Sequence, residues 1–258
     1  MENIVLYELS NRVAYITLNR EDRRNALNPE MINALSAALT KAGNDSSVKV
    51  IVIRANGNVF CSGADLAHLQ KLQSNSFEEN LSDSLLLAEL FKTIYLHPKI
   101  IIAQVEGAAI AGGCGLATVC DFTFATPDSR FGYTEARIGF VPAIVMFFLI
   151  RKIGEAKAKQ FLYTGKLTDA QTAFDSGLIN KIYSAESIRQ SVQEFAEGIC
   201  RDSSAQSLTM TKLMIANVQS LSLEDAMNYA ARMNANARET DDCRKGISAF
   251  LNKETIQW

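Results

Sequence analysis

The residues best suited to chemistry lie in a glycine-rich stretch at residues 105–121. It contains four glycines, at Gly107, Gly112, Gly113 and Gly115. An apolar run at residues 99–105 precedes them and an apolar segment follows, which predicts a strand, a turn and a helix start. Glycine permits close approach to the main chain, and free N–H groups at a helix N-terminus favour negative charge. The predicted chemistry is stabilisation of an oxygen that becomes negative. For this stretch alone, tight packing is an equally good interpretation.

Two other segments offer groups for the same kind of chemistry. Residues 58–66 break at Gly63, so the N–H of Ser62 is a candidate second donor; the alternative is a turn with Asp65 as a helix cap. Glu135 follows a mostly apolar segment. It is either a solvated loop residue or a carboxylate beside an apolar pocket, with a pKa raised into the range useful for acid–base work. The glycine spacing excludes a P-loop and a dinucleotide fingerprint.

The elements that must position these groups follow a recurring order. Residues 4–9 and 12–18 predict a hairpin, and a helix begins at Asn28-Pro29. Strands are predicted at residues 48–53, 99–105 and 122–125. The polar residues 75–80 predict a mobile loop, followed by a helix that ends near His97. The unit that recurs is strand, strand, helix.

The second half of the sequence is mainly helical. Helices are predicted at residues 154–163, 168–174 and 185–200, with a strand at 179–183, and nearly everything after residue 203 has a helical pattern. We therefore divide the chain into a core at residues 1–200 and a helical region at 201–258. Such a region often packs against another subunit.

Composition excludes several classes of protein. The 258 residues are 48% hydrophobic, and 26 Lys and Arg against 28 Asp and Glu give a net charge of −2, so neither nucleic acid nor membrane is an expected partner. Five cysteines without a C-x-x-C pair predict reduced thiols and a cytoplasmic location. The N-terminus has no signal-peptide pattern, and the apolar tract at residues 138–150 is shorter than a membrane span. His68 and His97 lack metal-ligand partners at suitable spacing, so no metal is expected.

Five ordered motifs together resemble one family. They lie at residues 24–28, 60–66, 107–121, 131–135 and 240–250. The sequence resembles the crotonase (enoyl-CoA hydratase/isomerase) superfamily along nearly its whole length, and is most similar to enoyl-CoA hydratase and methylglutaconyl-CoA hydratase-like members. The resemblance implies an α/β fold, a spiral of repeated strand-strand-helix units with a C-terminal helical trimerisation region. It also implies a homotrimer or homohexamer.

The same resemblance implies an acyl-CoA substrate, with coenzyme A as part of the substrate and no other cofactor. It places the catalytic acid/base on Glu135 and the oxyanion-binding N–H groups on Ser62 and Gly112. The coenzyme A contacts that it implies are Arg23, Arg24, Ala26, Ala64, Asp65 and Leu66, with Phe250 and Lys253 contributed by a neighbouring subunit. A solvated surface is the alternative for the basic residues.

Two departures from the family pattern leave the reaction open. The best-known hydratases carry two glutamates, and Gly115 stands in the place of the first. The chain is therefore interpreted as an enoyl-CoA hydratase that adds or removes water across the α,β bond, with an enoyl-CoA isomerase and a non-catalytic CoA-binding protein as alternatives. Bulky apolar residues at 143–150 resemble relatives that act on short branched substrates such as methylglutaconyl-CoA, an intermediate of leucine degradation. Core packing of a helix is the other interpretation of this run.

Overall fold

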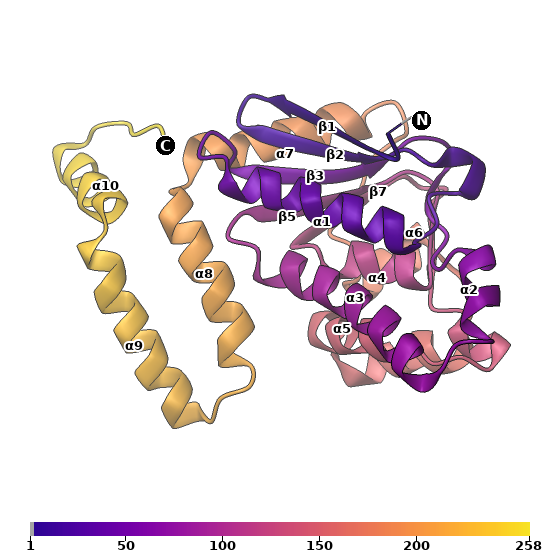
Figure 1. Ribbon diagram of the computed structural model, residues 1–258. Coiled ribbons are helices and arrows are strands. Elements are labelled where there is room, and N and C mark those ends of the chain that lie inside the picture. Colours follow the sequence, from indigo (N-terminus) through magenta and orange to yellow (C-terminus); the bar gives the residue numbers. More distant parts are fainter. Residues whose placement is uncertain (1–2) are drawn as a thin grey trace.

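The computed structural model describes residues 3–258 and contains two β-sheets (Figure 1). In the larger sheet, β1 and β2 form the expected antiparallel hairpin and the other neighbours are parallel. Its strand order is β1 (Val5–Ser10), β2 (Val13–Leu18), β3 (Val50–Ala55), β5 (Ile100–Val105), β7 (Phe122–Ala125) and β10 (Lys181–Ile182).

The smaller sheet holds the strands that lead into the candidate site. Its order is β4 (Val59–Cys61), β6 (Ala108–Ile110), β8 (Arg130–Gly132) and β9 (Thr168–Asp169). β4, β6 and β8 are parallel, whereas β9 is antiparallel to β8. Along the chain, β3 is followed by β4, β5 by β6 and β7 by β8, so each pair contributes one strand to each sheet. Helices follow each pair, which confirms the predicted strand-strand-helix unit.

The helices after these strand pairs differ in length. After β4 come α2 (Leu66–Leu72) and α3 (Phe77–Leu96), and after β6 comes α4 (Gly112–Val119). After β8 come the 3₁₀ helix η2 (Glu135–Ile138) and α5 (Ala143–Thr164), and α6 (Ala170–Ser176) follows β9.

Two helices cover the two faces of the larger sheet because alternate strand residues point to opposite faces. Ile16 and Ile51 belong to the same buried cluster as the apolar face of α1 (Pro29–Asn44). Val50 and Val52 belong to a second cluster with the apolar face of α7 (Ile188–Asp202). As predicted, the side chain of Asn28 caps α1, accepting a hydrogen bond from the Met31 N–H.

One local prediction is wrong and another is confirmed. Residues 75–80 are not simply a loop, because Ser76 and Glu79 form a capping box that starts α3 at Phe77. The helix predicted from Gly154 is confirmed as the second part of α5, because Gly154 has a non-helical backbone, with φ +77°, and separates two helical pieces of α5. α5 itself starts at Ala143, so the apolar run at residues 143–150 lies in its first piece.

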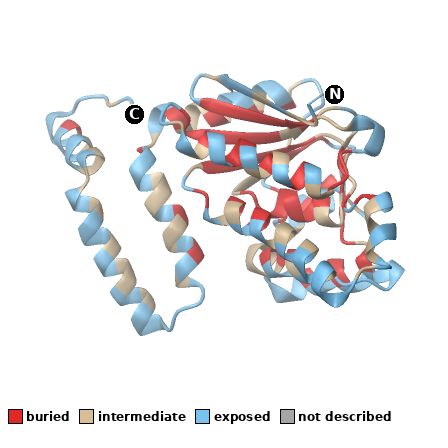
Figure 2. Cartoon of the chain, viewed as in Figure 1, coloured by how far each residue is buried: buried red, intermediate tan, exposed pale blue. Residues whose placement is uncertain are grey.

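The segment after residue 203 is helical, as predicted, and forms an extended arm. It contains α8 (Ala205–Val218), α9 (Leu223–Glu239) and α10 (Asp241–Asn252). In Figure 1, α9 and α10 lie on the far side of α8 from the sheets. Figure 2 shows them mostly exposed, and α9 has no buried residue.

A buried lysine joins α8 to the core. The Lys212 side chain is 6% exposed, and its Nζ donates to the carboxylate of Asp121 at 2.7 Å. It also donates to the carbonyls of Ile94 and Lys99, both at 3.1 Å. Because the Lys212 ammonium donates three hydrogen bonds, it fixes α8 relative to β5, α3 and the end of α4.

Candidate active site

Three chain segments converge at one edge of the smaller sheet. β4 leads into Ser62, β6 leads into α4, and β8 leads towards Glu135. These strands are parallel, so their C-terminal ends lie at the same edge, a frequent location for ligand sites in α/β proteins. The N–H of Ala111 donates to the carbonyl of Gly132 at 2.8 Å, which fastens the second segment to the third.

Glycines let the first two segments approach each other closely. A Cβ atom at Gly113 would lie 2.2 Å from the carbonyl oxygen of Cys61, nearer than real side chains come. A Cβ at Gly63 would lie 2.9 Å from the Cβ of Ala111, and Gly63 has φ +86°. The N-terminal turn of α4 therefore lies directly against the end of β4, which only glycine permits.

The N–H of Ser62 is not a free donor, which corrects one prediction. It donates to the carbonyl of Arg24 at 3.1 Å. The positive φ of Gly63 turns the chain, so the N–H of the next residue, Ala64, points in a different direction from the N–H of Ser62. Leu27 donates to the Gly63 carbonyl at 2.7 Å and accepts from Asp65 at 2.9 Å, so Ala64 pairs with Leu27 while its own N–H points away from that pairing.

Two neighbouring backbone N–H groups remain available to bind a ligand oxygen. Within residues 3–258, neither the Ala64 N–H nor the Gly112 N–H has a hydrogen-bond acceptor. Gly112 is the first residue of α4, and Ala111 supplies no side-chain cap. A Cβ at Gly112 would lie 3.9 Å from the Cα of Gly63, which shows how near the two turns are. The donor pair offered by the fold is therefore Ala64 and Gly112.

Ala111, the residue directly before α4, has a strained backbone conformation. Its φ of +51° and ψ of −123° belong to a region that glycine tolerates and alanine disfavours. This conformation turns the chain sharply from β6 into α4. Strain of this kind is typical of functional sites.

Glu135 is a buried carboxylate with an unused oxygen. Its side chain lies at the start of η2, the residue is 8% exposed, and Oε2 has no hydrogen-bond partner. Burial raises the pKa of Glu135 above its usual value. The prediction of a raised pKa for Glu135 is therefore confirmed, and the alternative of a solvated loop residue is wrong. A raised pKa makes the Glu135 carboxylate a stronger base than an ordinary glutamate.

A buried pair of hydroxyl groups stabilises the loop that leads to Glu135. The Tyr133 phenol and the Thr118 hydroxyl lie 2.7 Å apart and link the loop after β8 to α4. Burial raises the pKa of the Cys114 thiol to about 12, and the nearby Glu135 charge adds to this shift. None of these groups supplies a positive charge to Glu135.

The expected coenzyme A residues lie in two places. Arg23 and Arg24 are exposed in and after η1 (Glu21–Arg23), and Ala64 and Leu66 are exposed across the Leu27–Ala64 pairing. Ala26 and Asp65 are buried. These residues form one rim beside the donor pair.

Phe250 and Lys253 are not near that rim in the same chain. Phe250 is 82% exposed on α10, and Lys253 caps the end of that helix. Their contribution from a neighbouring subunit stays a prediction.

Sequence reasoning missed Arg20 and Asn25, which hold the rim, whereas the predicted helix cap at Asp65 is confirmed. The Arg20 guanidinium contacts the Asp65 carboxylate at 2.7 Å, and Asp65 also caps α2. Buried Asn25 accepts from the Arg20 N–H and donates to the carbonyls of Asn56 and Val59. The asparagine in the 24–28 motif was the available signal, since Asn tolerates the left-handed conformation that it adopts here, with φ +52°.

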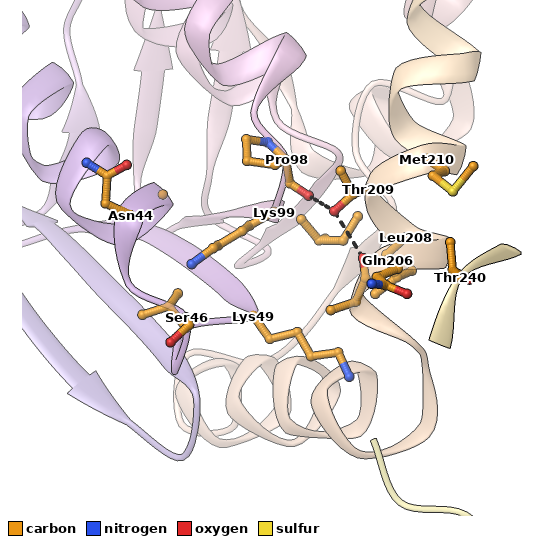
Figure 3. Close-up of a pocket in the computed structure, with 14 residues that line it drawn as sticks. Asn44, Ser46, Lys49, Pro98, Lys99, Gln206, Leu208, Thr209, Met210 and Thr240 are labelled. Atoms are coloured by element: carbon orange, nitrogen blue, oxygen red, sulfur yellow. Dashed lines mark hydrogen bonds between the residues drawn. The ribbon is translucent and has the colours of Figure 1, made fainter. Parts of the chain in front are cut away.

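Other features of the structure do not add to this site. A cavity of about 510 Å³ lies near the end of α1 and the start of α8, and no predicted site residue lines it. Figure 3 shows some of its lining residues, among them Lys49, Lys99 and Gln206. In residues 3–258 no group of three or more His, Cys, Asp or Glu is arranged to hold a metal. No helix in the described chain has the length and apolar character needed to span a membrane.

Comparisons with known proteins identify one family. The family model described as enoyl-CoA hydratase/isomerase matches residues 8–258. A Thermus thermophilus protein named provisionally as an enoyl-CoA hydratase is 40% identical over 93% of this chain and 95% of its own length. Crotonyl-CoA hydratase from Syntrophomonas wolfei is 32% identical, covering 98% of this chain and 96% of that protein. The crystal structure of an enoyl-CoA hydratase from Shewanella pealeana superimposes with a TM-score of 0.93 at 26% identity, covering 99% and 96% of the two chains.

Proposed function

The chain belongs to the enoyl-CoA hydratase/isomerase family, and we propose that it is an enoyl-CoA hydratase with Glu135 as its acid/base. The observation that carries this proposal is the buried Glu135 carboxylate, with one oxygen unpartnered, at the same sheet edge as the free N–H groups of Ala64 and Gly112. The hydratase names of the relatives support the choice of reaction.

In this proposal the two N–H groups bind the thioester oxygen of the acyl-CoA. Water adds through its oxygen to C3, and the π electrons move towards C2 and the thioester oxygen, where negative charge develops. The N–H groups of Ala64 and Gly112 stabilise that charge. One such donor typically lowers a barrier by about 3 kcal/mol.

Glu135 transfers the protons in the same reaction. Its ionised carboxylate takes a proton from the attacking water and then returns one to C2. The raised pKa suits this double role, because the group must both accept and release a proton. The reverse sequence removes water. The proposal needs no metal or other cofactor, and coenzyme A is carried by the substrate.

Coenzyme A is proposed to lie along the rim of the site. Arg23 and Arg24 offer exposed guanidinium groups for its phosphates, and the backbone around Ala26, Ala64 and Leu66 lies along the same rim. Asp65 contributes by holding Arg20 and the start of α2 rather than by meeting the anionic ligand.

The acyl group is proposed to be short and branched, such as methylglutaconyl, which would place the enzyme in leucine degradation. The support is the apolar start of α5, where Val145 and Phe148 are buried and Phe147 is half exposed. A cytoplasmic location is part of the same proposal.

An enoyl-CoA isomerase is the second candidate, favoured by one observation. Gly115 has no side chain, and apolar groups of Val145 and Phe91 surround it, so no second carboxylate acts from this part of α4. Glu135 alone could remove a proton from C2 of a 3-enoyl thioester and return it to C4, which moves the double bond without adding water.

The arm is proposed to assemble the chain into a homotrimer or homohexamer. α9 and α10 expose Leu223, Met227, Phe250 and Leu251, and in the described chain they pack mainly on α8 and on each other. A second copy would cover these side chains. Light scattering at micromolar concentration should give a mass of three or six chains, and a monomer would contradict this.

The reaction is tested with purified protein and three thioesters, crotonyl-CoA, methylglutaconyl-CoA and a 3-enoyl-CoA, in ¹⁸O-labelled water. Mass spectrometry should find labelled oxygen in the product, with the branched thioester preferred. A shifted double bond without label would establish the isomerase instead. Binding without turnover of any thioester would support the non-catalytic CoA-binding alternative.

A further inference from the structure

The first turn of α4 packs unusually closely against the first turn of α5. A Cβ atom at Gly115 would lie 2.2 Å from Cγ1 of Val145 and 3.0 Å from Cε2 of Phe91. Phe91 is fully buried and Val145 is 3% exposed. The volume that a side chain at position 115 would need is therefore already filled by the isopropyl group of Val145, with the Phe91 ring as its neighbour.

This contact lies one helical turn from the donor Gly112 and on the chain segment that follows Glu135. Gly115 is three residues after Gly112 and thus one helical turn from a free donor, and its N–H bonds the carbonyl of Ala111 at 3.0 Å. Val145 follows Glu135 along the same segment, through η2 into α5, and the N–H of Phe140 bonds the Glu135 carbonyl at 3.0 Å. Val145 therefore connects the segment that carries the carboxylate with the helix that carries the donor.

We propose that Val145 is a specificity-determining residue that closes the wall of the site at Gly115. The methyl groups of Val145 make this wall apolar. They also limit the space for the acyl carbons next to the thioester. Gly115 and Val145 are then a complementary pair, in which a larger residue at one position requires a smaller residue at the other. The inference rests on the proposed function for the identity of the ligand, but the packing of the pair does not depend on it.

The packing is tested by a double-mutant cycle on thermal unfolding. Gly115→Ala should lower the unfolding midpoint by about 5 °C or more, because the added methyl meets Val145. Val145→Ala combined with Gly115→Ala should recover at least half of that loss, because the volume is exchanged. Equal midpoints for Gly115→Ala and the wild type, or no recovery in the double variant, would overturn the pairing.

The specificity is tested with crotonyl-CoA and its analogues carrying an added methyl on C2 or C3. Val145→Ala should raise kcat/KM for at least one branched analogue, relative to crotonyl-CoA, by about tenfold, as expected for one methyl group in an apolar pocket. Val141→Ala is the matched control, since Val141 lies in the same apolar run but is exposed, and its ratios should equal those of the wild type. Ratios within twofold of wild type for both analogues would overturn the role of Val145.

The two proposals fail in different ways. If the wild type turns over no thioester, the proposed function fails, and the same ratios are then measured as dissociation constants by calorimetry. A tenfold change in relative affinity in Val145→Ala would still support the inference. No binding of any of the three thioesters would overturn it together with the function.

Discussion

Gly113 should be the position where the smallest change has the largest effect on the site. A methyl group at this position would lie 2.2 Å from the Cys61 carbonyl oxygen and 2.7 Å from its carbonyl carbon. These are backbone atoms that cannot rotate away, and the first distance is roughly 1 Å short of normal contact. In Gly113→Ala, α4 must therefore move away from the end of β4, which separates the Gly112 N–H from the Ala64 N–H.

The magnitude follows from that displacement. Overpacking of this kind typically costs about 1–3 kcal/mol of folding free energy. A misplacement of about 1 Å in a catalytic group can lower turnover by about 100-fold. We expect Gly113→Ala to remain folded, to unfold at a lower temperature and to lose about two orders of magnitude in kcat/KM towards its acyl-CoA.

The assays are thermal unfolding and steady-state kinetics, with Gly198→Ala as the matched control. Gly198 lies inside α7, and a Cβ there would meet only the Arg201 guanidinium at 3.8 Å. This variant should keep full activity and gain about 0.5–1 kcal/mol, because alanine favours a helix over glycine. Unchanged kcat/KM in Gly113→Ala would refute the close approach of α4 as the basis of the donor pair.

Four further predictions concern the anchor of the arm, the strained turn and, in two cases, the buried carboxylate. Lys212→Met should destabilise the chain by about 3 kcal/mol in urea unfolding, because it removes the counterion of Asp121 and leaves that carboxylate only the hydrogen bond from the Ile101 N–H. Lys92→Met, at an exposed ion pair, should cost less than about 0.5 kcal/mol, and equal losses would contradict the burial argument. Ala111→Gly should raise the free energy of unfolding by about 1 kcal/mol by relieving the positive φ, and a loss of stability would argue against strain. Burial raises the pKa of Glu135 above 4.5, so kcat/KM should fall as the pH is lowered through that raised pKa, and a flat profile down to pH 4.5 would contradict its role as the base. The folded state also loses stability as the pH rises through the window between 4.5 and the raised pKa, so Glu135→Gln should raise the unfolding midpoint more at pH 7 than at pH 4.

The sequence predicted the repeated unit of the fold because that unit depends on local patterns. The β-branched runs that became β3 and β5 and the Asn28-Pro29 helix start are local signals, and the structure confirms them. The start of α3 was missed because a polar capping box was interpreted as a loop. The helix start at Gly154 is a further local signal, and the structure confirms it as the junction of two helical pieces within α5.

The site was predictable in its residue types but not in its backbone directions. The segments around Gly63, Gly112 and Glu135 were identified, yet which N–H is free depends on the positive φ of Gly63 and on the hydrogen bond from Ser62 to Arg24. Neither appears in a sequence pattern. The contact of Gly115 with Val145 joins positions that are far apart in sequence, so it also required the structure.

The most direct test of the account is the rate of ¹⁸O incorporation into the product by Glu135→Gln. The exposed Glu78→Gln variant serves as the control for removing one carboxylate. The account predicts that Glu135→Gln binds acyl-CoA and folds like the wild type but incorporates labelled oxygen about 100- to 10,000-fold more slowly, as expected when a general acid/base is removed. Incorporation within tenfold of the wild-type rate would show that another group moves the proton.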